Sequence, residues 1–359
     1  MSEKSTTKIT GTEDKSKKER MLLLQEAFRE GLAEEMRRDP KIIYMGEDVG
    51  RYGGVYGCTK GLWNEFGDDR VRDTPISEGA IVGATIGAAA TGMRAIGEVM
   101  YADFIGAGGA IEQIVNQLAK IPWVGNGQTK LPAMIMTQEG SRYPVVSNGP
   151  HHNQCFEAWF MHVPGLQVVT PSTPYDTKGL LKTVLRTDKP TIFFLHRLIF
   201  YARHKLLEGI YPQMVSYIPT EEYTIPLGKA DIKREGSDVT VVATMATVHK
   251  ALRAAEILEK EGISLEIVDP RTLVPLDKET IINSVKKTGK AVVVSDDCKT
   301  CGVAAEFLSV IVEGAFDYLD APVKRVSGLD VPLSYNNKME GAALPSPEDI
   351  VAAVKEVVA

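Results

Sequence analysis

The sequence contains few cysteines, no long apolar segment and no excess of positive charge. Four of its 359 residues are cysteines, too few for a disulfide framework, and this low number fits a reducing compartment. The glycine- and alanine-rich stretch 79–93 has 15 residues without a charge, whereas a membrane-spanning helix needs roughly 20 apolar residues. A formal net charge of -6 gives no basic field for a nucleic acid. We therefore expect a cytoplasmic protein with neither a membrane nor a nucleic acid as a partner.

Several common sequence signals are missing as well. Residues 1–20 mix acids with bases and lack the apolar core of a secretion signal, so we expect a disordered tail there. The chain has no Gly-x-x-x-x-Gly-Lys-Ser/Thr phosphate loop, no Gly-x-Gly-x-x-Gly dinucleotide motif and no Gly-x-Ser-x-Gly nucleophile elbow. These absences argue against the common nucleotide-binding and hydrolase folds.

Strand-like apolar runs alternate with helical periodicity along the rest of the chain. The apolar runs are residues 42–45, 133–136, 167–170, 191–195, 239–243, 264–268, 291–294 and 323–326. Helical patterns occur at residues 24–36, 175–186, 249–260, 280–286 and 303–316. Strictly alternating strands and helices predict parallel sheets that are covered on both faces.

A stretch punctuated by prolines, residues 211–226, separates the strands and helices into two series. We predict an α/β fold with two domains and mainly parallel sheets: residues 21–205, a linker at 206–228, and residues 229–359. The last helix is expected to begin after Ser346, because Ser-Pro-Glu-Asp forms a capping box with proline at the first helical position.

A further helix is expected to begin near Ser77, and it carries Gly79, Gly83 and Gly87 at four-residue spacing. Each glycine costs about 1 kcal/mol relative to alanine inside a helix, so this spacing needs a structural reason. We expect another helix to cross this glycine ridge closely, at a subunit interface.

Two polar clusters are candidates for chemistry. Glu47 and Asp48 follow the apolar run 42–45, where α/β proteins place ligand contacts, although either carboxylate could simply cap a turn. His151 and His152 belong to a polar loop, where a histidine can exchange protons near neutral pH. An ordinary packing or surface role for these histidines stays open.

Cys298 and Cys301 form a single Cys-x-x-Cys pair. Such a pair can be redox-active or can supply half of a zinc site. No second pair accompanies it, so we expect two ordinary thiols and no metal site.

Many short motifs, taken together and in order, resemble the beta subunits of thiamine-diphosphate-dependent 2-oxo acid dehydrogenases. The resemblance covers roughly residues 20–359 and is closest to the pyruvate and acetoin dehydrogenase members of this transketolase-like family. It rests on residues 45–50, 52–55, 73–78, 152–154, 164–166, 171–174, 226–230, 268–273 and 287–289. A series of motifs in register is far more specific than one short match.

The resemblance implies a pyrimidine-binding thiamine diphosphate domain followed by a transketolase C-terminal domain. It also implies an α2β2 heterotetramer in which the alpha subunit mainly holds the magnesium and the diphosphate. The Gly-Asp-Gly motif of alpha subunits is not matched here, because Gly67-Asp68-Asp69 lacks the second glycine. The resemblance thus makes this chain half of an active site.

The family's site residues can be carried over to six positions. Glu78 would bond a nitrogen of the cofactor's pyrimidine ring, and His152 would face the substrate. An apolar pocket formed by Ile76, Ile81 and Val82 would favour a protonated carboxyl group at Glu78. The residues implied to bind the cofactor are Glu47, Ile76, Glu78, Met100 and Phe104, with Phe104 stacked on the pyrimidine ring.

The implied reaction is decarboxylation of a small 2-oxo acid and transfer of the acyl group to the lipoyl group of an acyltransferase. Asn153 departs from the family's His-Ser-Gln motif and leaves the substrate open. Three alternatives stay open: the beta subunit of an acetoin dehydrogenase, half of a split transketolase, and a noncatalytic docking subunit.

Overall fold

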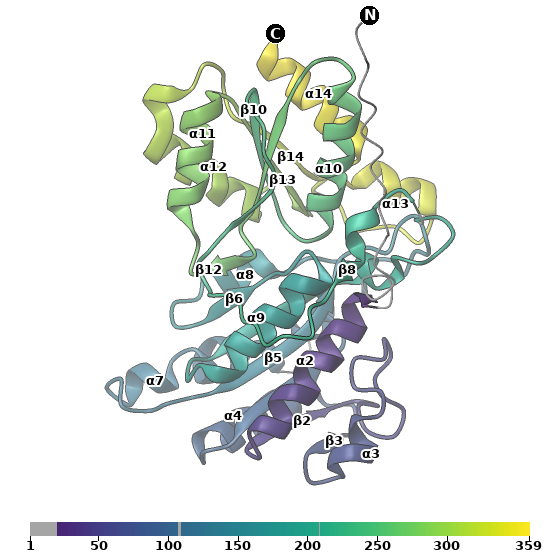
Figure 1. The fold of residues 1–359 in the computed structure, drawn as a ribbon. Coiled ribbons are helices and arrows are strands. Elements are labelled where there is room, and N and C mark those ends of the chain that lie inside the picture. The colour runs from purple at the N-terminus through teal and green to yellow at the C-terminus, as the bar shows by residue number, and fades with distance from the viewer. Residues whose placement is uncertain (1–19, 107–108, 208) are drawn as a thin grey trace, which may run out of the picture.

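The computed structural model describes residues 20–106, 109–207 and 209–359. Two layered α/β units lie one above the other, with the C-terminal unit at the top of Figure 1. Each unit is built on a sheet of its own. Of the tail expected at residues 1–20, all but Arg20 lie outside the described residues.

The first sheet has seven strands in the order β12-β6-β7-β5-β4-β2-β3. All neighbouring strands are parallel except β12, which runs antiparallel to β6. The strands are β2 (Ile42–Gly46), β3 (Val71–Asp73), β4 (Arg94–Val99), β5 (Ala133–Glu139), β6 (Gln167–Val169), β7 (Thr191–His196) and β12 (Thr272–Val274).

Strand β2 shows why the apolar runs become buried strands. Successive side chains of a strand point to opposite faces of its sheet. Ile42 and Tyr44 pack into the cluster beneath helices α2 (Leu24–Arg38) and α9 (Pro174–Arg186). Ile43 and Met45 pack into the cluster beneath α4 (Glu78–Ala90) on the other face. The sheet is therefore covered on both faces, as the apolar runs predict.

The second sheet has the order β14-β13-β10-β11-β9, and only β9 is antiparallel to its neighbour. Its strands are β9 (Asp231–Arg234), β10 (Val239–Ala243), β11 (Leu265–Asp269), β13 (Ala291–Cys298) and β14 (Lys324–Gly328). Helices α10 (Ala246–Glu259) and α14 (Pro347–Val358) pack on one face, and α11 (Lys278–Thr288) and α12 (Val303–Ala315) on the other. The capping box at Ser346 is confirmed, because Asp349 N donates to its Oγ at 3.1 Å.

Shorter elements connect these layers. They are β1 (Met21–Leu22), which pairs with β8 (Ser216–Tyr217), and α3 (Leu62–Phe66), α5 (Ala102–Ile105), α6 (Ala110–Glu112), η1 (Gln113–Leu118), α7 (Ile121–Val124), α8 (Glu157–Met161), η2 (Arg197–Tyr201), η3 (Pro212–Met214), η4 (Phe316–Tyr318) and α13 (Asn337–Ala343). Among the described residues, no helix combines the length and the apolar character needed to cross a bilayer.

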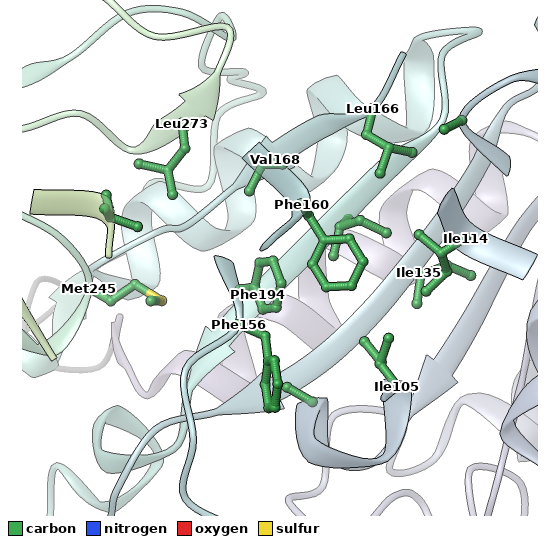
Figure 2. Packing of buried hydrophobic residues seen from close by; sticks show 14 of the residues in the cluster. Ile105, Ile114, Ile135, Phe156, Phe160, Leu166, Val168, Phe194, Met245 and Leu273 are labelled. Carbon is green, nitrogen blue, oxygen red and sulfur yellow. The ribbon is translucent and has the colours of Figure 1, made fainter. Parts of the chain in front are cut away.

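The two sheets share one hydrophobic core. Figure 2 shows Phe160, Val168 and Phe194 of the first unit with Met245 and Leu273 of the C-terminal part of the chain. Leu273 belongs to β12, so a strand from the second half of the sequence extends the first sheet and anchors the C-terminal unit to it. The predicted α/β class with two mainly parallel sheets is confirmed.

Helix α4 confirms the helix expected near Ser77. A Cβ atom added at Gly83 would come within 4 Å of only the Gln113 side chain, at 3.5 Å, and one at Gly87 would have no described atom that close. Gln113 begins η1, which contacts α4, but no backbone atom of another described helix lies within 4 Å of either Cβ position. The expected subunit interface stays a prediction.

Buried lysines link α2 to α9. Lys178 Nζ lies 2.6 Å from Glu30 and 2.7 Å from Glu34, and Lys182 Nζ lies 2.7 Å from Glu34. The two lysine side chains are 2% and 1% exposed, whereas the Glu34 side chain is 32% exposed. Glu34 therefore neutralises two buried ammonium groups while keeping access to water itself.

This asymmetry predicts unequal effects of mutation. Glu34→Ala removes a charged hydrogen-bond partner from two buried ammonium groups and should lower the free energy of unfolding by about 1–3 kcal/mol. Lys182→Met leaves only carboxylates that water can reach, and should cost about 1 kcal/mol or less. Urea denaturation of both variants measures the difference, and equal losses would contradict this account of the contact.

Candidate functional site

The six residues expected at the site all follow the carboxyl ends of adjacent parallel strands. In the order β5-β4-β2-β3, the segments that leave these strands lie at one edge of the sheet. His152 follows β5, Met100 and Phe104 follow β4, Glu47 follows β2, and Ile76 and Glu78 follow β3. Open α/β sheets bind their ligands at such an edge.

Backbone contacts hold two of these segments together. Thr74 N donates to Gly46 O at 2.9 Å, and Gly50 N donates to Asp73 Oδ1 at 2.6 Å. These bonds tie the loop that carries Glu47 to the segment that leads into α4. A Cβ at Gly46 would lie 3.0 Å from the Cβ of Glu98, so glycine permits this close approach of β2 to β4.

Several carboxyl groups lie at this edge of the sheet, and they differ in how deeply they are buried. Burial raises the pKa of Glu47 above its ordinary value, and the negative charges of Glu78 and Asp48 raise it further. The Oε1 atom of Glu47 is buried and has no hydrogen-bond partner among the described residues. Glu47 therefore presents a carboxyl oxygen that a bound molecule can satisfy.

Glu98 is a buried residue one position before the end of β4, the strand next to β2. Tyr44 OH donates to it at 2.6 Å and Gln138 Nε2 at 2.7 Å. Burial raises the pKa of Glu98, although both hydrogen bonds favour its charged form. Sequence reasoning missed this residue; a glutamate inside an otherwise apolar segment was the available signal.

Phe104 and His152 meet edge to face. Their ring centroids are 5.3 Å apart with an interplanar angle of 85°, and the Tyr101 ring lies 5.6 Å from His152. Burial lowers the pKa of His152; Arg197 adds to this effect and Asp103 opposes it. His152 Nδ1 is buried without a partner among the described residues, so the ring keeps a free hydrogen-bonding atom at the site.

Sequence reasoning also missed Arg197, a fully buried residue that follows β7. Its guanidinium carbon lies 4.4 Å from the centroid of Tyr101, and its Nε donates to Tyr56 OH at 3.0 Å. A further guanidinium nitrogen donates to Asn153 Oδ1 at 3.1 Å. An arginine directly after a buried strand was the only sequence signal for it.

Ile76 does not shelter Glu78 within this chain. Its side chain is 80% exposed, whereas Ile81 and Val82 are 2% and 0% exposed and turn into the core beneath α4. The expected apolar wall around Glu78 is thus incomplete, because the loop that carries Ile76 has no described element packed over it.

The two cysteines of the Cys-x-x-Cys pair, Cys298 and Cys301, are exposed free thiols. Within the ranges 20–106, 109–207 and 209–359, no group of three or more His, Cys, Asp or Glu residues is arranged to hold a metal ion. The chemistry that the site offers comes from carboxyl groups, one imidazole and aromatic rings. Such a set can bind a flat heterocycle and hold a proton on one of its nitrogens.

Comparison with protein families assigns both units. Residues 20–201 match the transketolase pyrimidine-binding domain, and residues 228–350 match the transketolase C-terminal domain. The chain is 43% identical to the 2-oxoisovalerate dehydrogenase subunit beta of Bacillus subtilis, over 92% of this chain and 97% of that protein. It is 41% identical to the mitochondrial pyruvate dehydrogenase E1 component subunit beta of Dictyostelium discoideum, over 93% and 90%.

Two further similarities concern acetoin and transketolase. The subunit beta of the Bacillus subtilis acetoin:2,6-dichlorophenolindophenol oxidoreductase is 37% identical, over 94% of this chain and 97% of that protein. Among solved structures, a split-gene transketolase described as an inactive beta4 tetramer matches with a TM-score of 0.72 and 22% identity, over 94% and 98% of the two chains. This second likeness shows the fold alone.

The charges around His152 predict opposite titration shifts. Asp103→Asn removes a negative charge and should lower the pKa of His152 further, whereas Arg142→Gln removes a positive charge and should raise it. The chain has six histidines, and NMR titration of their ring signals follows each one. A shift of the same sign in both variants would contradict this electrostatic arrangement.

Proposed function

Because the chain belongs to the family of beta subunits of 2-oxo acid dehydrogenases, we propose that it is the beta half of the decarboxylating component of such a complex. The observation that carries the proposal is the single sheet edge at which Glu47 and Glu78 lie with the Phe104–His152 ring pair. The substrate class is a small 2-oxo acid, and the acyl product passes to a lipoyl group on a partner acyltransferase.

The residues at the edge fit thiamine diphosphate. The unpartnered Glu47 Oε1 and His152 Nδ1 are buried polar atoms that need a ligand or water, and Phe104 offers a partly buried ring. When bound, this cofactor supplies a nucleophilic carbon and the means to delocalise the charge that decarboxylation leaves. The protein then has to bind, orient and exclude water.

Each residue takes one role in this proposal. Glu78 holds a proton against a nitrogen of the pyrimidine ring, and Phe104 stacks on that ring. Glu47, Ile76 and Met100 line the same ring. His152 faces the substrate, where its imidazole donates a hydrogen bond or a proton; its lowered pKa favours the neutral ring.

An alpha subunit completes the site in an α2β2 heterotetramer. The 80% exposed Ile76 supports this, because an apolar side chain beside a proposed cofactor site needs a further surface over it. Gly67-Asp68-Asp69 offers no complete diphosphate motif, so we assign the magnesium and the diphosphate to the alpha subunit. The four cysteines among the described residues are free thiols, which agrees with a protein that acts in the reducing cytoplasm.

Acetoin is the second candidate substrate. The 37% identical acetoin relative, which aligns over 94% of this chain, supports it. Half of a split transketolase has weaker support, because the likeness at 22% identity concerns the fold. The catalytic set of carboxylates and rings argues against a subunit that only docks other proteins.

The half-site predicts that the isolated chain neither decarboxylates 2-oxo acids nor binds thiamine diphosphate tightly. Calorimetric titration with thiamine diphosphate and magnesium should give no stoichiometric binding to the chain alone. Adding an alpha subunit of the same family should restore both binding and turnover of pyruvate or a branched 2-oxo acid. Tight binding of thiamine diphosphate by the chain alone would contradict the assignment of the magnesium and the diphosphate to the alpha subunit.

Glu78→Gln is predicted to lower turnover of the assembled enzyme by about 100-fold or more, because an amide cannot share the proton that general acid–base catalysis requires. Assembly, measured by sedimentation, should be unchanged. Glu348→Gln is the matched control, since Glu348 is an exposed carboxylate in the first turn of α14. Equal activities of the two variants would make Glu78 an ordinary helix-end carboxylate.

A further inference from the structure

A buried cation and a buried anion lie near His152 without touching each other. Arg197 and Glu340 are both 0% exposed. Neither takes part in a salt bridge with any residue in the described part of the chain. Buried charges are costly unless they are paired or hydrogen-bonded, so something else must compensate them.

The side-chain amide of Asn153 joins these two charges. Its Oδ1 accepts a hydrogen bond from Arg197 at 3.1 Å, and its Nδ2 donates one to Glu340 Oε1 at 2.7 Å. Asn153 itself is 1% exposed. The polarity of the amide matches both neighbours, with the acceptor toward the cation and the donor toward the anion.

The bridge connects the two units of the fold. Glu340 lies on α13 of the C-terminal unit and also accepts a hydrogen bond from Ser141 Oγ at 2.6 Å. Arg197 belongs to the segment that follows β7 of the first sheet. The residue after His152 is therefore clamped from both units.

Arg197 also holds the other neighbour of His152. Its guanidinium lies 4.4 Å over the Tyr101 ring, and Tyr101 packs edge to face on His152 at 5.6 Å. One arginine thus fixes an aromatic neighbour of the imidazole and, through Asn153, the backbone beside it. Cation–π contacts and charged hydrogen bonds strengthen when they are buried.

We infer that Asn153 is a positioning residue: its amide, held between Arg197 and Glu340, fixes the orientation of the His152 imidazole for the substrate. This inference rests on the proposed function for the identity of the reaction. A serine at this position would carry donor and acceptor on one oxygen atom, whereas the amide presents them on two separate atoms, one toward Arg197 and one toward Glu340.

Asn153→Asp tests the bridge with an isosteric change. It places two carboxylates side by side, and these must share one proton to restore the hydrogen bond. The other charged or titratable groups around His152 are Tyr101, Asp103, Arg142, His151 and Arg197, and Asp296 and Asp297 line the same cavity as Asn153. Because wild type shares these groups, the ratio of kcat in the variant to kcat in wild type isolates the new pair.

We expect this ratio to be about one-tenth or lower near pH 8 and to rise as the pH falls toward about 6, with KM changed about twofold or less. Asn153→Ser, which keeps a small polar side chain, should lower kcat about tenfold at every pH. Ser141→Ala is the control, because it removes the other hydrogen bond to Glu340 without touching the His152 loop. Its kcat should stay within about twofold of wild type.

A second readout does not depend on activity. In the full chain, the NMR signal of the His152 ring, identified by its loss in His152→Gln, should shift or broaden in Asn153→Ser and stay unchanged in Ser141→Ala. Unchanged His152 signals in both Asn153 variants, or a loss of thermal stability with wild-type kcat per folded molecule, would overturn the inference. If the wild-type assembly does not act on 2-oxo acids, the proposed function fails, and the NMR comparison still decides the role of Asn153.

Discussion

The site depends on one constraint: the first sheet is parallel and is covered on both faces. Side chains within its strands are therefore mostly apolar, and most polar groups enter where a strand ends. Glu47 follows the end of β2, and His152 follows the end of β5. Glu98 in β4 and Gln138 in β5 are buried polar exceptions, and Glu98 is stabilised by hydrogen bonds from Tyr44 and Gln138. The same constraint thus separates the apolar core from the polar residues of the candidate site and keeps the two close together.

Matched buried charges hold the C-terminal unit against this edge. Lys233 Nζ of the C-terminal unit lies 2.5 Å from Asp176 Oδ2 of α9. Asp296 of the C-terminal unit lies 3.1 Å from Nε2 of His196, at the end of β7, and is also paired with Lys250 of its own unit at 2.7 Å. Burial acts to raise the pKa of Asp296, but the Lys250 ammonium and the His196 ring hold it well below its ordinary range. Such pairs add less stability than apolar packing, but another arrangement of the two units would leave buried charges unpaired, which is costly.

Much of the fold was predictable because burial on two faces leaves a simple signal. Residues 239–243 were predicted as a strand and form β10 with the same bounds. Strand β4 was missed because Gly97 and Glu98 interrupt its apolar run: Gly97 leaves room for Thr85 of α4, and Glu98 is hydrogen-bonded to residues of neighbouring strands. The residues expected at the candidate site came from the family resemblance and not from periodicity, and they lie at one edge of the first sheet. Arg197 and Glu340 were not predicted, because their partners lie 44 and 187 residues from them in sequence.

The exposed Ile76 side chain leaves one side of the candidate site open. Glu47 is partly buried, whereas Ile76, beside Glu78, is 80% exposed. A carboxyl group shares a proton most readily where water is excluded, and an exposed isoleucine cannot exclude water. A second apolar surface placed over Ile76 would bury that side chain and would also exclude water from the start of α4. The burial that drives association would then also prepare the carboxyl group for proton transfer, so assembly and activation would be one event.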